Sequence, residues 1–388
     1  MKNVHTGFHP SRNRGLSLIE ILVGLAIGLI GLLIMFQVFT ASGERVRTTT
    51  SGTDAQIAGT LAMFQLDRDL RMAGWGIGDV GAAGGCSVEV HNGNGALAKP
   101  DFNFVLTPVK LIPNATLGGP VQIAVLYGNS SYVVTQRIYS NPSAFTKTLV
   151  SRGGFNLGDI VLVTDALGAN CALVELTGPP PPMSDSVVVE HNQVTYKNSY
   201  SGANVAATMN AAAGTPALTV GGFAYNLGPT PSRNLWQVTP AGAANPNMLV
   251  WNNTLSSDTQ LAVTEGIVNL QAEYGVDTST STPPTGIVDS WTSIAPIDWT
   301  KLLAVRIAIL ARSQQYEKTA VTTVPPFWAN DYGPAAAQSI NNGAGHKFLM
   351  FNVDGTADSA PGNANDWRHY RYKVYESTVP LLNPIWSK

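Results

Sequence analysis

The sequence is poor in charge and in cysteine. Charged residues make up 12% of its 388 residues, roughly half of the usual quarter. The formal net charge is −2, and no basic patch indicates binding to nucleic acid. The two cysteines lack C-x-x-C spacing, which argues against a structural metal site. We therefore expect neither a nucleic-acid partner nor a bound metal, and we interpret the weakly charged surface as that of an exported protein.

Signatures of catalysis are also missing from the sequence. It has no G-x-S-x-G, no G-x-x-x-x-G-K loop and no G-x-G-x-x-G behind a strand. Asn352, Asp354 and Asp358 lack the spacing and the closing glutamate of an EF-hand, so we interpret them as turn residues. We expect no enzyme activity and no cofactor. The six histidines form no H-E-x-x-H motif, and all but His5 and His9 are far apart in the sequence: His5, His9, His91, His191, His346 and His369.

One long apolar run lies near the N-terminus. No charged residue occurs between Ile21 and Gly43, and as a helix this run would reach roughly 35 Å, enough to cross a hydrocarbon core of about 30 Å. Glu20 stands at its start, where a carboxylate is costly and marks a functional position. A cleaved signal peptide and an uncleaved anchor with a cytoplasmic basic end both remain open. The length of the run and its acid favour the anchor.

The junction at Gly15 supports a more specific interpretation. Arg14-Gly15, followed by Leu16 and Glu20, resembles the class III leader of type IV prepilins and of type II secretion pseudopilins. The resemblance implies that a prepilin peptidase cleaves between Gly15 and Leu16 and methylates Leu16, while the apolar helix is retained. Glu20 would then be the fifth mature residue and would act in subunit assembly.

Three glycines interrupt the apolar run. Gly24, Gly28 and Gly31 are three or four residues apart, so they share a helix face that permits close packing against other helices. Each costs roughly 1 kcal/mol of helix propensity relative to alanine. Glycine is also common in membrane helices for no specific reason. We nevertheless expect these three to pack helices together in a filament.

Helical periodicity continues beyond the apolar run. Thr48–Gly52 is poor helix-forming sequence that could bend or break a helix. Apolar residues then recur every three or four positions from Ile57 to Ala73. Asp67 and Arg71 are spaced as an i,i+4 ion pair, and Gly74 with two further glycines should end the helix.

Several stretches resemble the PilW family of minor pilins. In that family a segment like Asp69–Gly76 closes the long N-terminal helix, and a Gly-Cys pair follows, as Gly85-Cys86 does here. Leu382 stands where the family usually has arginine. The resemblance covers residues 12–75 and about 261–385, whereas residues 90–260 match nothing known. The other similar segments are Glu273–Asp277, Ala304–Ser313 and Thr378–Asn383.

The two cysteines are Cys86 and Cys171. An oxidising compartment would let them pair, and closing a loop of this length would stabilise the fold by roughly 4–5 kcal/mol in the chain-entropy model. Two free buried thiols are the alternative.

Beyond residue 80 the apolar period becomes two, which predicts strands. In Leu302–Arg312 the odd-numbered apolar residues alternate with Arg306 and Arg312, which predicts a half-buried strand with polar residues outward. Proline-rich 179–182 should be a connector, and 203–216 and 278–284 should be loops. The other strand candidates are Val121–Tyr127, Tyr132–Tyr139, Asp159–Thr164, Cys171–Leu176, Ser186–Tyr196, Leu235–Thr239, Met248–Trp251 and Tyr370–Tyr375.

These observations predict an α+β, pilin-like fold. A long N-terminal transmembrane and amphipathic helix would pack on an antiparallel β-sheet in an enlarged β-rich head. The expected divisions are a leader of residues 1–15, a helix of residues 16–75 that is transmembrane over about 16–40, and a head of residues 76–388 with a variable middle, 90–260.

The resemblance implies a minor pilin that primes type IV pilus assembly, sits at or near the pilus tip and supports adhesion and twitching motility. Its partners would be other minor pilins, the major pilin, a large tip adhesin, prepilin peptidase and the inner-membrane assembly platform. The chain would be single-pass in the inner membrane, with a cytoplasmic N-terminus and a periplasmic head, before reaching the pilus. The alternatives are a minor pseudopilin of type II secretion, an adhesin that binds a ligand through its middle region, and an anchored enzyme.

Overall fold

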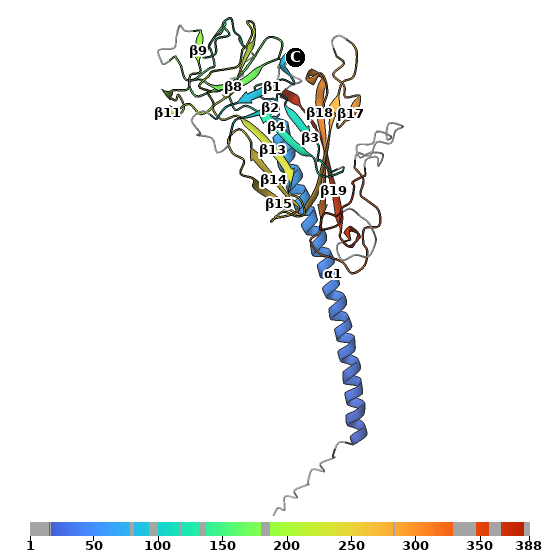
Figure 1. The fold of residues 1–388 in the computed structure, drawn as a ribbon. Coiled ribbons are helices and arrows are strands. Elements are labelled where there is room, and N and C mark those ends of the chain that lie inside the picture. The colour runs from blue at the N-terminus through green and yellow to red at the C-terminus, as the bar shows by residue number, and fades with distance from the viewer. Residues whose placement is uncertain are drawn as a thin grey trace, which may run out of the picture. The chain divides into compact units, whose positions relative to one another are not determined.

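The computed structural model describes residues 15, 17–77, 81–92, 100–116, 118–131, 137–179, 187–281, 284–328, 347–356 and 366–383. The chain forms two compact units, residues 1–52 and 53–388. Helix α1 (Leu18–Met72) contributes to both, and a β-rich head makes up most of the second unit (Figure 1). The architecture is α+β and pilin-like, as predicted.

The first unit contains the apolar part of α1. Leu18–Gly43 is a 26-residue span with a mean hydropathy of 2.7, long and apolar enough to cross a membrane. Its large apolar side chains are all exposed. The helix starts where the N–H groups of Glu20 and Ile21 donate to the carbonyl of Ser17, at 3.0 and 3.2 Å. The backbone stays helical across Thr48–Gly52, so the break considered there does not occur.

In the second unit, the C-terminal half of α1 packs against two sheets, which lie alongside it in Figure 1. Its buried residues recur every three or four positions: Ala55, Ala58, Ala62, Leu66 and Leu70. The helix ends at Met72, and Gly74 and Gly76 follow with φ of 82° and 83°. Glycine adopts this left-handed conformation without strain, so the predicted helix stop is confirmed.

The two sheets around the helix are antiparallel. One is five-stranded, in the order β15-β14-β13-β4-β3, and the other is four-stranded, in the order β17-β16-β18-β19. Their strands are β3 (Val109–Ile112), β4 (Gln122–Tyr127), β13 (Ser232–Val238), β14 (Met248–Asn253), β15 (Leu261–Glu265), β16 (Ile267–Val276), β17 (Ser290–Thr292), β18 (Leu302–Arg312) and β19 (Tyr372–Pro380).

A third sheet, with six strands in the order β2-β1-β8-β7-β12-β5, forms a separate part of the head. Its faces bury two further apolar clusters. The pair β1–β8 is parallel, whereas the other pairs are antiparallel. The strands are β1 (Ser87–Val90), β2 (Phe102–Val105), β5 (Arg137–Ile138), β7 (Ile160–Thr164), β8 (Cys171–Glu175) and β12 (Phe223–Gly228).

The remaining elements are short. Two-stranded ribbons pair β6 (Thr146–Thr148) with β9 (Val188–Glu190), and β10 (Thr195–Lys197) with β11 (Asn204–Ala206). The candidate strand Ser186–Tyr196 is thus two strands, and the predicted loop 203–216 contains β11. Residues 132–136 of another candidate, and 180–182 of the proline run, lie outside the described residues. The 3-10 helices are η1 (Gly81–Ala83), η3 (Trp299–Lys301) and η5 (Trp367–His369).

Strand β18 has the predicted bounds, but it is not half-buried. Every residue from Leu302 to Ala311 is buried, because a cluster that includes Trp328 covers the face opposite the helix. Arg306 lies on that face, 8% exposed, in an ion pair with Glu273 of β16. An outward-pointing polar face was therefore the wrong prediction for this strand.

Candidate functional site

The predicted processing site precedes α1. Gly15 and Ser17 are described, whereas Leu16 lies outside the described residues. Glu20 occupies the first turn of α1 and is exposed. An acid in a first turn is favourable, because the helix dipole places partial positive charge there. The cleavage and methylation at Gly15 and Leu16, and the assembly role of Glu20, stay predictions.

The three glycines of the apolar span lie on an open helix surface. A Cβ placed on Gly24, Gly28 or Gly31 would meet nothing within 4 Å among the described residues. Contiguous exposed apolar surface of this size is typical of a membrane or protein interface. The glycines are therefore available to a neighbouring helix, as their predicted packing role requires.

A buried carboxylate fastens the end of α1 to the five-stranded sheet. Asp69 is 8% exposed. Its Oδ1 accepts hydrogen bonds from the Tyr127 hydroxyl at 2.7 Å and Asn234 Nδ2 at 2.9 Å, and its Oδ2 accepts from Trp236 Nε1 at 2.6 Å. Burial raises the pKa of Asp69 above its ordinary 3.8, and the three hydrogen bonds oppose this rise.

An amide from the far end of the chain caps the same helix. Asn383 Nδ2 lies 3.4, 3.2 and 3.0 Å from the carbonyl oxygens of Arg71, Met72 and Ala73. The last carbonyls of a helix have no partner within it, so this amide satisfies groups that would otherwise need water. We call Asp69 and Asn383, with their hydrogen-bond partners, the helix-end clamp.

Strand β19 contacts α1 at two levels along the helix, through Tyr375 and Ser377. Tyr375 donates its hydroxyl to the carbonyl of Gln56 at 3.0 Å, and its ring lies where a Cβ on Gly59 would be. Ser377 donates to Asp67 at 3.0 Å, and Asp67 forms the predicted i,i+4 ion pair with Arg71 at 2.6 Å. The absence of a side chain at Gly59 is thus what lets the strand approach the helix.

Cys86 and Cys171 form a disulfide, with Cα atoms 6.3 Å apart. It joins the residue before β1 to the first residue of β8, which are adjacent strands of the six-stranded sheet. The pairing expected from the sequence is present.

A buried basic pair lies at the β6–β9 ribbon, where no sequence pattern predicted it: Lys147 belongs to β6, and His191 follows β9. Lys147 is fully buried, and its Nζ lies 3.2 Å from His191 Nε2 and donates to the hydroxyl of Thr215 at 3.3 Å. Burial lowers the pKa of Lys147 to about 8. Burial, together with the charge of Lys147, lowers the pKa of His191 to about 3.

Asn352 and Asp354, which the sequence predicts to be turn residues, lie in a turn that Thr356 closes. The N–H of Asn352 donates to the carbonyl of Thr356, and Asp354 accepts from the N–H of Thr356 at 3.0 Å. Asp358 lies outside the described residues. Among the residues that the structure describes, no group of three His, Cys, Asp or Glu side chains could hold a metal ion.

Two family models match the chain. Residues 10–36 match the prokaryotic N-terminal methylation motif, and residues 230–383 match the type IV pilus-assembly protein W model. The second match starts at β13, earlier than the resemblance noted in the sequence, and so includes part of the expected variable middle. No curated protein and no solved structure matches the chain.

Proposed function

Because this chain belongs to the PilW family of type IV pilus proteins, we propose that it is a minor pilin that primes pilus assembly, stays at or near the pilus tip and supports adhesion and twitching motility. The observation that carries this proposal is the combination, in one chain, of an exposed apolar helix behind a methylation motif and a PilW-type head. The PilW match favours a pilus over a type II secretion pseudopilus.

The proposal includes a sequence of processing steps. The chain inserts with a cytoplasmic N-terminus and a periplasmic head, and prepilin peptidase then cleaves after Gly15 and methylates Leu16. The retained helix joins those of other minor pilins, with the inner-membrane platform driving addition of the major pilin. The helix supplies hydrophobic attachment over a 26-residue span, whereas the head supplies its contacts to neighbouring heads and to a tip adhesin.

Glu20 would set the axial register of each incoming helix. After cleavage the amine of Leu16 is positive, and an acid one helical turn away lies in surroundings of low dielectric. An unpaired charge in lipid costs several kcal/mol, and pairing with the amine of a neighbouring subunit removes most of that cost. One axial position would therefore be strongly preferred over others.

Mass spectrometry of the mature N-terminus tests the processing step. Gly15→Val should retain the leader, because a side chain obstructs the peptidase at the backbone, and should abolish surface pili while the protein remains in the membrane. Ser11→Val, in the leader but outside the motif, is the matched control. A methylated Leu16 N-terminus in the Gly15→Val protein would show that the leader assignment is wrong.

Co-purification from membranes tests the role of Glu20. Glu20→Ala and Glu20→Gln should still be cleaved and inserted, but should recover fewer minor pilins and reduce piliation. Gln37→Ala, within the same span, should behave as wild type. A Glu20→Ala protein that recovers its partners fully would rule out the register role, and recovery of secretion pseudopilins instead of pilins would refute the pilus assignment.

A further inference from the structure

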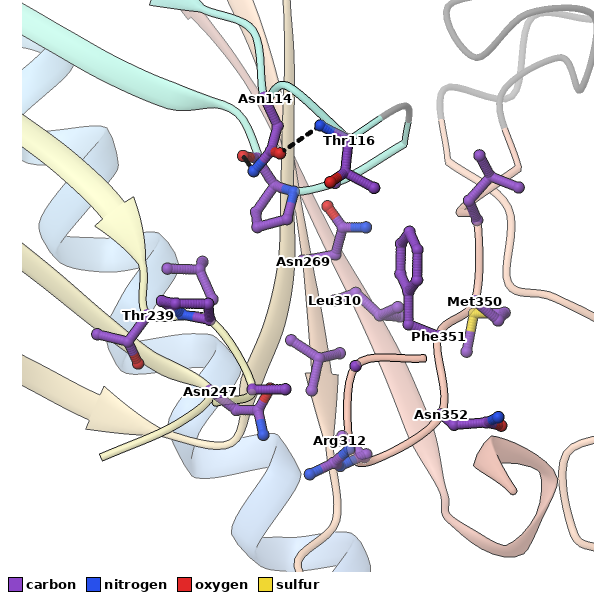
Figure 2. A pocket seen from close by; sticks show the side chains of 18 of the residues that line it. Asn114, Thr116, Thr239, Asn247, Asn269, Leu310, Arg312, Met350, Phe351 and Asn352 are labelled. Atoms are coloured by element: carbon purple, nitrogen blue, oxygen red, sulfur yellow. Dashed lines mark hydrogen bonds between the residues drawn. The ribbon is translucent and has the colours of Figure 1, made fainter. Parts of the chain in front are cut away.

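A groove opens between the two sheets that surround α1. Its larger hollow has a volume of 510 Å³, within the range of small-ligand sites. Figure 2 shows residues of the turn after β3, such as Thr116, facing those of the β13–β14 turn and the segment 347–356, including Phe351. A second hollow of 290 Å³ shares Asn247 and Arg312 with the first and so extends it.

Six carboxamide side chains line the larger hollow: Asn114, Gln122, Gln237, Asn247, Asn269 and Asn352. The Nδ2 groups of Asn114, Asn269 and Asn352 each donate one hydrogen bond within the protein, at 3.1, 3.0 and 3.1 Å. A carboxamide carries a second N–H and two acceptor lone pairs besides, which suits sugar hydroxyls that both donate and accept. Gln122 Nε2 donates to Gln237 Oε1 at 2.9 Å. The amide oxygen of Gln122 and the N–H groups of Gln237 are then available to bind a ligand. Phe351, which is half-buried, offers an aromatic face beside these groups.

Arg312 is the charged group at the junction of the two hollows. Its guanidinium lies 5.0 Å from the ring centroid of Tyr370 and is hydrogen-bonded to the Tyr372 side chain, and these two contacts hold it in place. No carboxylate among the described residues forms an ion pair with it. A guanidinium in this position can bind a carboxylate through two parallel hydrogen bonds.

The two acids that line the hollows are engaged elsewhere. Asp354 accepts hydrogen bonds from the N–H and hydroxyl of Thr356, at 3.0 and 2.7 Å. Glu265 accepts from Gln314 Nε2 at 3.1 Å. Both acids are exposed, whereas Arg312 is half-buried. Solvent therefore screens the repulsion between these acids and a bound anion more than it screens the attraction between Arg312 and that anion.

We propose that this groove binds an acidic carbohydrate. The carboxylate of one sugar meets Arg312, while the neighbouring rings lie in the larger hollow against Phe351 and the carboxamides. Strands β4, β13, β16 and β18 line the groove from the interior of their sheets, so their backbone groups are already paired and cannot take up a peptide strand. The proposal goes beyond pilus assembly and stands or falls independently of it.

Calorimetric titration of the full-length protein tests the proposal, in a detergent without a sugar head group. The acidic probes are tetragalacturonic acid, disialic acid and a hyaluronan tetrasaccharide, and maltotetraose is the neutral control. We expect at least one acidic probe to bind more tightly than maltotetraose, with affinity that falls as salt rises. Absence of binding by all three acidic probes at millimolar concentration, or equal binding of maltotetraose, would overturn the proposal.

Variants then locate the site. Arg312→Gln and Phe351→Ala should each weaken binding of that probe roughly tenfold or more, whereas Arg68→Gln, on the exposed surface of α1, should not. Thr116→Trp changes an exposed residue and should block the larger hollow without unfolding the head, as its thermal unfolding midpoint would verify. Undiminished binding by both Arg312→Gln and Thr116→Trp would place the ligand elsewhere and refute the assignment.

Discussion

Removal of the Asp69 carboxylate should loosen the attachment of α1 to the head more than any surface substitution on the helix. In Asp69→Ala the indole N–H of Trp236, which is 3% exposed, loses its acceptor. The Tyr127 hydroxyl and Asn234 Nδ2 lie 3.0 Å apart and can still pair with each other. The buried indole N–H of Trp236 is thus left without an acceptor, and Tyr127 and Asn234 each lose one of their hydrogen bonds.

The magnitude follows from these three groups. A buried donor without an acceptor costs about 1–3 kcal/mol, and each lost hydrogen bond about 1 kcal/mol. We therefore expect Asp69→Ala to lower the free energy of unfolding by about 2–5 kcal/mol. Asp69→Asn should lower the free energy of unfolding by about 1–3 kcal/mol, because the NH₂ group of the new carboxamide would face a donor while its oxygen could still accept a hydrogen bond.

Urea unfolding followed by tryptophan fluorescence measures these changes in the full-length protein. Asp67→Ala, two residues away, is the matched control: it loses a partly exposed ion pair with Arg71 and the hydrogen bond from Ser377, which together should lower the free energy of unfolding by no more than about 1–2 kcal/mol. An Asp69→Ala protein no less stable than Asp67→Ala would refute this account of the helix-end clamp.

The pH dependence of the same residue has a definite sign. Because burial raises the pKa of Asp69 above 3.8, the folded protein holds this proton more tightly than the unfolded chain. The contribution of Asp69 to stability is therefore greatest below pH 3.8 and falls as the pH rises through the folded pKa. The stability advantage of wild type over Asp69→Asn should accordingly be larger at pH 3.5 than at pH 7.

Three further predictions concern the head and its contact with α1. Neither cysteine should react with an alkylating reagent until a reductant is added, as mass spectrometry would show, and full alkylation without reductant would contradict the disulfide. The pKa of His191 is lowered from 6.5 to about 3 in the folded protein, so between these pH values the unfolded chain binds a proton that the folded protein does not. The free energy of unfolding should therefore fall as the pH drops below 6.5. His191→Gln should reduce this fall between pH 7 and pH 5, as urea unfolding at the two pH values would measure. Gly59→Ala should lower the free energy of unfolding by about 1–3 kcal/mol, because the new Cβ would overlap the ring of Tyr375. Gly52→Ala is the control: the described residues leave its new Cβ unobstructed, so it should leave the free energy of unfolding unchanged or raise it by up to about 1 kcal/mol. Equal effects of the two substitutions would contradict the close approach of β19 to the helix at Gly59.

The helix and the main strands could be predicted because their signals are local. The apolar span, the three-and-four spacing beyond it and the glycines after it set α1 within a few residues of its observed bounds, Leu18–Met72. The alternation in Leu302–Arg312 gave the bounds of β18. It could not give the burial of both faces, since the covering residues Trp328 and Phe348 come from segments without regular structure.

The clamp and the groove depend on contacts that no local pattern encodes. Asn383 caps carbonyls 310 to 312 residues earlier in the chain, and the register of β16 on β18 sets Glu273 opposite Arg306. Asp69 and Asn383 both lie in segments that resemble the PilW family, so that resemblance located the residues without revealing that they meet. The groove combines two turns of the five-stranded sheet with the segment 347–356, which lies between β18 and β19 in the chain, and its carboxamides form no sequence motif.

The division of the head between matched and unmatched sequence largely follows a division of its cores, although β3 and β4, outside the match, also contribute to the cluster around α1. The PilW match, residues 230–383, contains β13, β14, β16, β18 and β19, which share one apolar cluster with α1. The six-stranded sheet lies entirely outside the match and has apolar clusters of its own, and the disulfide links two of its strands. Since attachment to the helix depends on the first cluster and the clamp, sequence change in the six-stranded sheet can alter the surface it presents while leaving that attachment intact. Substitutions there should therefore affect what the head contacts before they affect whether α1 is held.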